Sequence, residues 1–414
     1  MGREHTAVKK SFLVCTGCGR TWPVTRTFPR CDFCAEPLEV RGVVPGRIRG
    51  SRFPHRTLLE RYRDFFPFRS LNGELSLGEG FTPLVRSARL AGATGLGDLF
   101  FKNETVNPTW SFKDRGTVSG VQHALCLGYE RIGTVSSGNM AASVAAYGAR
   151  AGLKTFVLVS AALPAEKIAP IAIHGPVLIR VDGDYGELYF RSIEIGKRRG
   201  IYFINSDVPF RVEGSKTIAF EICEQLRFRV PDWVVVPVSA GGNLRGIIKG
   251  FEEFRDAGLI AAMPRFAAVQ AAGCAPVYRA FREGSERVKR VARPETLAHA
   301  IENPFPPSGN EVLRKIRAMG GVVAAVSDEE MIAAQRELAG EGILAQPEGA
   351  APLAAVRSLA GEGRITRGET VACIVTGGGL KYTAAFDFHR FRVADCTLSS
   401  LEDRILSEDP GDGG

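Results

Sequence analysis

The chain has 414 residues, of which 45% are hydrophobic and 24% charged. These are ordinary values for globular proteins, and the length suffices for two or three domains with a large core. The net charge is +8, no run approaches the roughly 18 apolar residues that span a bilayer, and no apolar leader with a cleavage pattern stands at the N-terminus. We therefore expect a cytoplasmic protein rather than a membrane or secreted one.

A cluster of four cysteines lies near the N-terminus in the spacing C-x2-C-x12-C-x2-C. Its members are Cys15, Cys18, Cys31 and Cys34. Small turn residues within each pair are typical of zinc knuckles, so residues 1–44 are predicted to form a zinc ribbon. Two disulfides are the alternative, which a reducing cytoplasm disfavours. Four thiolates would fill the coordination sphere of the zinc, so we expect a structural rather than a catalytic zinc. A module of this size is too small to fold without such a cross-link.

Residues 45–75 are rich in arginine and proline and contain several aromatic residues. A basic stretch of this kind could bind nucleic acid, lie on the protein surface as a connector, or attract phosphorylated substrates. We favour a basic connector and expect no nucleic-acid partner.

A lysine stands at a predicted turn-to-helix junction in residues 107–115, which read Asn-Pro-Thr-Trp-Ser-Phe-Lys-Asp-Arg. Lys113 could be a solvated surface lysine with helix-capping residues around it. Alternatively, it could carry pyridoxal phosphate through a Schiff base. The surrounding segments have to decide between these readings.

Three further segments follow the same layout of a strand, a polar turn and a helix. Residues 134–140 read Thr-Val-Ser-Ser-Gly-Asn-Met, residues 234–244 read Val-Val-Val-Pro-Val-Ser-Ala-Gly-Gly-Asn-Leu, and residues 372–381 read Ala-Cys-Ile-Val-Thr-Gly-Gly-Gly-Leu-Lys. Each places polar groups at the C-terminal end of a strand, where open α/β sheets bind ligands. Glycines before a helix N-terminus could hold a phosphate, although the second segment alone could also be an ordinary turn.

Strand and helix patterns alternate after residue 76, which predicts a mainly parallel sheet with helices on both faces. Strands are expected at 131–135, 155–159 and 177–181, and the tail at 407–414 is expected to be disordered.

From about Leu75 to about Thr383 the sequence resembles fold-type II pyridoxal-phosphate enzymes, and among them the threonine synthases, on the motifs just quoted. The resemblance implies a two-lobed, tryptophan synthase β-like α/β fold behind the zinc ribbon. The large cofactor-binding lobe would comprise 76–113 and 213–395, the small mobile lobe 114–212, and the C-terminal tail 396–414. Many fold-type II enzymes are dimers, so a homodimer is compatible with this reading.

Roles for individual residues are implied by the same resemblance. Lys113 would hold the cofactor covalently and act in catalysis, Asn139 would lie beside its ring, and Thr376 would face the pyridine nitrogen. A neutral hydroxyl there makes the ring a weaker electron sink than an aspartate would, although Thr376 could also be a strand-end residue bonded to a carbonyl. The phosphate loop would consist of Ser239, Ala240, Gly241, Gly242 and Asn243.

The substrate of threonine synthases is O-phosphohomoserine, whose phosphate must also be held. Residues 205–211, Asn-Ser-Asp-Val-Pro-Phe-Arg, resemble the family's segment for this grip. Arg211 would pair with the dianion, although it could instead pair with Glu213. Hydrogen bonds to substrate are expected from Ser136, Ser137, Asn205 and Ser206.

Three residues depart from the family pattern. Met140 stands where a threonine is usual, Trp110 where a glycine is usual, and Gly378 where the motif Thr-Gly-His-Gly-Leu-Lys has histidine. Trp110 and Met140 suggest a reshaped substrate pocket. The alternatives are therefore a β-replacement synthase acting on another activated amino acid, a serine or threonine dehydratase, or a zinc-ribbon binding protein without catalysis.

Overall fold

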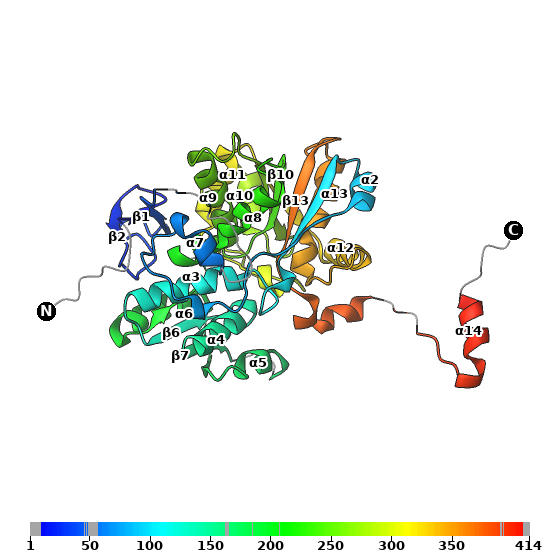
Figure 1. Ribbon diagram of the computed structural model, residues 1–414, viewed down its shortest axis with the longest axis horizontal. Helices are drawn as coiled ribbons and strands as arrows, with labels where there is room; N and C mark the ends of the chain where they lie inside the picture. Colours follow the sequence, from blue (N-terminus) through cyan, green and yellow to red (C-terminus); the bar gives the residue numbers. More distant parts are fainter. Residues whose placement is uncertain are drawn as a thin grey trace.

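The computed structural model describes residues 10–44, 46, 48, 57–161, 165–183, 185–206, 208–389, 391 and 393–408. Three sheets organise this part of the chain (Figure 1). The N-terminal sheet is antiparallel in the order β2-β1-β3, and its strands are β1 (Phe12–Cys15), β2 (Thr21–Pro23) and β3 (Leu38–Arg41).

The largest sheet has six strands in the order β12-β11-β10-β13-β5-β4, and only the edge strand β4 is antiparallel. Its strands are β4 (Leu84–Arg86), β5 (Asp98–Asn103), β10 (Trp233–Pro237), β11 (Arg265–Ala271), β12 (Val322–Val326) and β13 (Thr370–Val375). The strand β10 is fully buried along its length, as expected for a parallel strand covered on both faces.

Helices cover both faces of this sheet because its strand residues alternate between two apolar clusters. Val234 and Val236 of β10 pack into one cluster, while Val235 packs into the other. The helices grouped with this sheet are α2 (Ala88–Thr94), α7 (Pro209–Ser215), α8 (Thr217–Gln225), α9 (Gly242–Asp256), α10 (Pro276–Arg282), α11 (Gly309–Ala318), α12 (Asp328–Gly340) and α13 (Pro347–Gly361), of which α7 begins inside the span 114–212 proposed for the small lobe.

The third sheet is parallel, in the order β8-β7-β6-β9. Its strands are β6 (Arg131–Val135), β7 (Lys154–Ser160), β8 (Val177–Val181) and β9 (Tyr202–Phe203), and its neighbouring helices are α3 (Lys113–Cys126), α4 (Asn139–Arg150), α5 (Ala165–Ala172) and α6 (Tyr185–Arg199). The three strands expected from the sequence are confirmed as β6, β7 and β8. All four strands of this sheet lie inside the span 114–212 proposed for the small lobe. In Figure 1, β6 and β7 of this sheet lie on the same side of the molecule as β1 and β2 of the N-terminal sheet.

The stretch 57–75 differs from the surface connector expected from its composition. Its aromatic residues are fully buried in the main apolar cluster, because the short helix α1 (Leu58–Arg61) and the turns after it pack on α8 and α9. These residues are Tyr62, Phe65, Phe66 and Phe68. The positions 45, 47 and 49–56 of the predicted connector lie outside the described residues.

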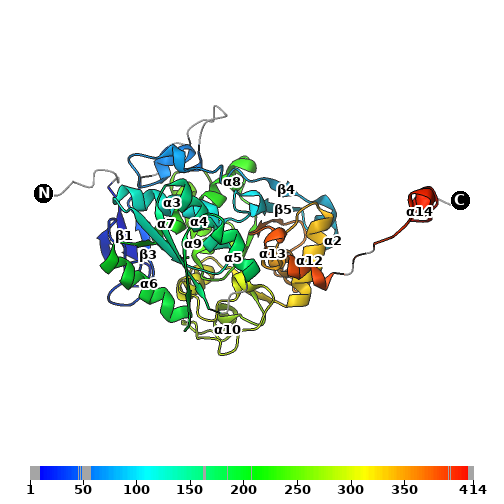
Figure 2. The same ribbon diagram turned by 90° about the horizontal axis from the view of Figure 1, so that it is seen from below.

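The C-terminal tail carries the helix α14 (Leu401–Glu408), which lies apart from the rest of the protein in Figure 1 and in Figure 2. Ser407 therefore belongs to a helix, whereas 409–414 lie outside the described residues. No helix of the described chain is long and apolar enough to cross a membrane.

Candidate active site

The carboxyl ends of β6, β10 and β13 converge on a cavity of about 1430 Å³ and on a small inner recess beside it. The two spaces share lining residues, among them Lys113, Asn139, Ser206 and Ser239. Of the residues proposed from the sequence to bind cofactor or substrate, all except Asn205 line one or both spaces. The strands β10 and β13 end at the same edge of the six-stranded sheet, and the end of β6 in the four-stranded sheet borders the same cavity, so distant motifs come together here.

Lys113 is the first residue of α3 and lines both spaces. The segment before it is fixed to the end of β13, because the Phe112 backbone N–H donates to the Thr376 carbonyl over 3.0 Å. Burial, followed by the positive charge of Arg211, lowers the pKa of Lys113 to about 7, although Glu348 acts in the opposite direction. An amine with this pKa is substantially neutral near pH 7, as a nucleophile or base must be.

Asp114 and Arg115, the acid and base that follow Lys113, are buried and bound by other protein groups. Asp114 accepts hydrogen bonds from the Thr109 hydroxyl and the Ser143 hydroxyl, both over 2.6 Å. Arg115 is fully buried and pairs with Glu104 at 2.7 Å and Glu221 at 2.6 Å. Because these charged groups are bound by protein partners, the main effect of the motif is to orient Lys113.

The glycine-rich loop after β10 has the features of an anion site. Gly241 adopts a left-handed backbone (φ 96°) directly before α9, a conformation that favours glycine. The amide oxygen and nitrogen of Asn243 are both buried without a partner among the described residues, and Asn243 lines the inner recess. A buried amide lacking partners is costly, so the recess suits a polar ligand that supplies them, such as the phosphate of pyridoxal phosphate.

Asn139 and Thr376 line the inner recess with Lys113, and Gln346 links Asn139 to the residue after Thr376. The Asn139 amide donates to the Gln346 side chain over 2.7 Å, and the Gln346 backbone N–H donates to the Gly377 carbonyl over 2.8 Å. A Cβ on Gly377 would come within 2.5 Å of the Gln346 amide oxygen, so this glycine is needed for the close approach.

Arg211, on α7, lines the inner recess and is buried. Its guanidinium donates to the Thr117 hydroxyl over 2.8 Å and to the Lys113 carbonyl over 3.2 Å. Within the described part of the chain it has no carboxylate partner, because Glu213 pairs instead with Lys216 and Lys249. The alternative reading of an Arg211–Glu213 pair is wrong, and Arg211 keeps a positive charge available for an anion.

Asn205 is the exception among the proposed substrate ligands. Its amide oxygen accepts from the Val135 backbone N–H over 3.0 Å, and its nitrogen donates to the Ser192 hydroxyl over 3.1 Å. It lines neither space, so a direct contact with substrate does not follow from its position. Asn205 instead joins β6 to the chain after β9 and to α6.

The departures from the family pattern have different structural settings. Met140 lines the large cavity, and its sulfur accepts from the Ser206 hydroxyl over 3.3 Å. Trp110 lines neither space and is half exposed, with a left-handed backbone (φ 57°). A Cβ on Gly378 would lie only 3.3 Å from the Trp110 Cβ, so a side chain at position 378 would crowd the chain at position 110.

Two charged residues of the site received no role from the sequence. Glu348, in the first turn of α13, lines both spaces, and Lys381 lines the large cavity and donates to the Thr109 carbonyl over 2.6 Å. Burial lowers the pKa of Lys381 to about 8. The position of Lys381 directly after the glycine motif could have identified it as a site residue from the sequence. Glu348 enters the site only through the packing of α13.

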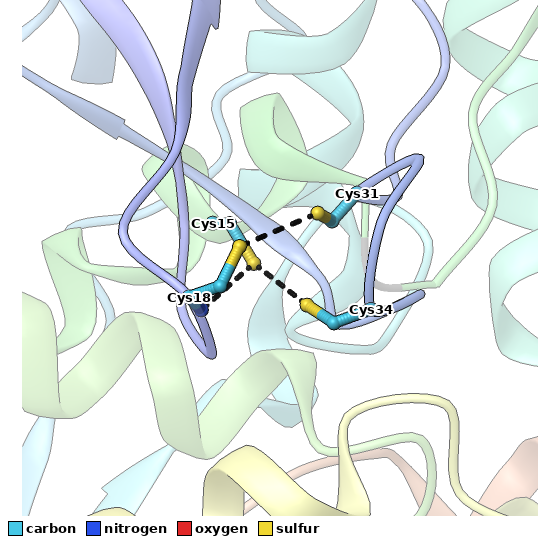
Figure 3. Close-up of side chains that lie close together, drawn as sticks. All are labelled: Cys15, Cys18, Cys31 and Cys34. Carbon is cyan, nitrogen blue, oxygen red and sulfur yellow. Dashed lines mark hydrogen bonds between the residues drawn. The ribbon is translucent and has the colours of Figure 1, made fainter.

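The four N-terminal cysteines form a second candidate site. Their sulfurs all lie within 4.8 Å of one another, with Cys15 and Cys34 at 3.3 Å and Cys18 and Cys31 at 3.6 Å (Figure 3). These distances are too long for disulfides, and all four thiols are free. Tetrahedral Zn²⁺ with bonds of about 2.3 Å places sulfurs ~3.8 Å apart, so the donor set fits zinc.

Comparison with known proteins agrees with this geometry. The model of the pyridoxal-phosphate dependent enzyme family matches residues 75–377. The threonine synthase of Methanocaldococcus jannaschii is 40% identical, and the match covers 89% of this chain and 92% of that enzyme. The threonine synthase of Methanosarcina acetivorans is 41% identical, and the match covers 81% of this chain and 84% of that enzyme.

Solved structures show the same fold. Diaminopropionate ammonia lyase from Escherichia coli superposes with a TM-score of 0.63 at 18% identity, covering 76% of this chain and 89% of its own. Maize serine racemase superposes with a TM-score of 0.60 at 22% identity, covering 79% of this chain and 92% of its own. The chain therefore belongs to the fold-type II family of pyridoxal-phosphate-dependent enzymes, in the branch of the threonine synthases.

Proposed function

We propose that this enzyme converts O-phosphohomoserine and water into threonine and inorganic phosphate. The observation that carries the proposal is the position of Arg211, a buried cation without a carboxylate partner among the described residues, in the same recess as Lys113. The curated relatives named above are threonine synthases, which supports the same substrate.

Pyridoxal phosphate, when bound, withdraws electrons from the substrate and so acidifies the protons on its Cα and Cβ. The neutral amine of Lys113 accepts the proton from Cα. A second proton then leaves Cβ, phosphate leaves Cγ with the C–O bond electrons, and water adds its hydroxyl to Cβ. The three protons released from Cα, Cβ and water end on Cα, on Cγ and on the departing phosphate, which gives threonine. Arg211 stabilises the phosphate dianion before and after this bond breaks, while Ser136 and Ser137 supply hydroxyl donors, and Ser206 would do so by giving up its hydrogen bond to the Met140 sulfur.

The direct test is to incubate cofactor-loaded protein with O-phosphohomoserine, measure phosphate release and identify the amino acid. Threonine in equal amount to phosphate supports the proposal. A normal cofactor absorbance without phosphate release would discard this substrate and keep the cofactor chemistry.

A β-replacement reaction on another activated amino acid is the second candidate, because Met140 offers no hydrogen bond to a phosphate and engages the Ser206 hydroxyl. Incubation with phosphoserine-like or acetylserine-like substrates and a nucleophile tests this candidate. Formation of the replacement product, faster than threonine from O-phosphohomoserine, would favour it.

Thr376 is proposed to face the ring nitrogen of the cofactor. Replacement by aspartate should change the protonation of that nitrogen, shift the visible absorbance of the bound cofactor and lower kcat by about tenfold or more. Thr376→Ser, which keeps the hydroxyl, should leave the spectrum in place. Unchanged turnover and spectrum in Thr376→Asp would remove this role.

We further propose that the cysteine cluster binds one structural zinc ion per chain. Metal analysis of protein purified under reducing conditions should find zinc in equal amount to chain, and Cys31→Ser should lose most of it because three ligands remain. Cys373→Ser, at a buried cysteine on β13, is the control and should keep the metal. Protein without zinc would contradict the assignment.

A further inference from the structure

The N-terminal ribbon, residues 10–44, is packed into the enzyme rather than attached to it by a linker. Leu13, Leu38 and Val40 belong to the same apolar cluster as Phe251 of α9. Lys249 of α9 donates to the Val40 carbonyl over 2.5 Å, and Arg245 donates to the Leu38 carbonyl over 3.2 Å. Thus β3 supports α9, the helix whose first residues, Gly242 and Asn243, belong to the proposed phosphate loop.

The second cysteine knuckle forms the outer wall of the large cavity. Glu36 accepts from Asn310 over 2.8 Å and from Arg314 over 2.6 Å, both on α11, and Arg30 donates to the Pro307 carbonyl over 2.6 Å. The ribbon residues that line the cavity are Gly17, Cys18, Arg30, Cys34, Ala35 and Glu36. Two cysteines of the proposed zinc site therefore border the space that contains Lys113.

The same ribbon also contacts the small lobe. Phe28 packs against the apolar cluster of Val135, Leu158, Ile193 and Phe203. Val135 ends β6, directly before the proposed substrate ligands Ser136 and Ser137. Phe28 is held from within the ribbon by Arg26, which donates to the Phe28 carbonyl over 3.1 Å and pairs with Asp32 at 2.6 Å, between the cysteines of the second knuckle.

From these contacts we propose that the ribbon is a strut between the two lobes that positions the small lobe for substrate binding. Phe28 is the positioning residue on the small-lobe side, and the four cysteines hold it in place when they bind metal. This inference rests on the proposed function, because it concerns the affinity of that same cleft for its phosphorylated substrate.

The physical reason is that the ribbon cannot keep its shape by itself. Its three strands are only three or four residues long, so closure of both knuckles depends on the metal. Loss of metal frees the segment 26–36, and Phe28 then leaves the small-lobe cluster. The loop 136–138 loses its support, whereas the cofactor contacts of α9 and β13, on the large lobe, remain.

The test compares two phenylalanines of the ribbon in the cofactor-loaded enzyme. Phe28→Ala should raise KM for O-phosphohomoserine about tenfold, with kcat within about twofold, and should raise amide hydrogen exchange in β6 and α6. Phe33→Ala is the matched control, since Phe33 is 67% exposed and lies outside the cavity and both lobes' apolar clusters. It should change neither quantity.

Removal of the metal by a chelator should reproduce the Phe28→Ala result, and zinc should reverse it, while the visible absorbance of the cofactor stays constant. Unchanged KM and exchange in Phe28→Ala would overturn the proposal, as would loss of the cofactor absorbance together with the metal, which would indicate general unfolding. If O-phosphohomoserine is not turned over at all, the proposed function fails, but the exchange measurements in β6 and α6 still decide the role of the ribbon.

Discussion

Replacement of Lys113 by alanine is expected to lower kcat for threonine formation on the order of 10³-fold or more. The variant lacks both the attachment point for the cofactor and the base beside Cα. It should also lose the visible absorbance of the lysine-linked cofactor. The measurement is turnover of O-phosphohomoserine together with an absorbance spectrum of the purified protein.

Lys381→Ala is the control within the same cavity. Lys381 also has a lowered pKa, about 8, and could be mistaken for the cofactor-bearing amine. Because Lys381 donates to the Thr109 carbonyl, its loss should keep the absorbance that Lys113→Ala loses. If Lys381→Ala loses the band and Lys113→Ala retains it, the two assignments must be exchanged.

Replacement of Arg211 by glutamine is expected to raise KM for O-phosphohomoserine about 10- to 150-fold, because a hydrogen bond to a charged group contributes about 1.5–3 kcal/mol. The same variant should bind inorganic phosphate more weakly by a similar factor. Arg211→Lys keeps the charge without the two-pronged geometry and should lie between. Arg229→Gln, at an exposed arginine, should match the unaltered enzyme.

The pH dependence of kcat gives a second readout for Arg211. Burial and, after it, the positive charge of Arg211 lower the pKa of Lys113 to about 7, so Lys113 is neutral above that pH and protonated below it. Removing the charge should raise this pKa and move the acid limb of the kcat profile to higher pH. An altered KM with an unmoved acid limb would place Arg211 away from the amine, and an unaltered KM would place the phosphate grip elsewhere.

The sequence identified the site residues whose role depends on local backbone and chain order. Lys113 at the start of a helix, Gly241 and Gly242 before another and Thr376 after a buried strand were all visible as strand-end motifs. Such motifs converge in any parallel sheet, because its strands share one carboxyl edge. The cysteine spacing likewise predicted a cluster of four sulfurs, since paired knuckles are local structures. The cluster is formed by Cys15, Cys18, Cys31 and Cys34.

Asn205 is the proposed substrate ligand whose position the sequence did not indicate. The motif places it beside Ser206, but a side chain can turn to either side of the chain, and here it satisfies the backbone of β6. The burial of Phe65 and Phe66 was also missed, because an arginine-rich composition says nothing about which face of a segment packs against a core.

The sequence by itself determined the family and the α/β fold and singled out Lys113 as the proposed catalytic lysine, since these depend on short motifs and hydrophobic periodicity. Only the tertiary structure decided that Glu348 and Lys381 enter the cavity, that Arg211 has no acidic partner among the described residues, and that the ribbon packs both in the cluster of α9 and against that of β6, β7 and α6. These facts depend on contacts between residues far apart in the chain, whose packing no local pattern records.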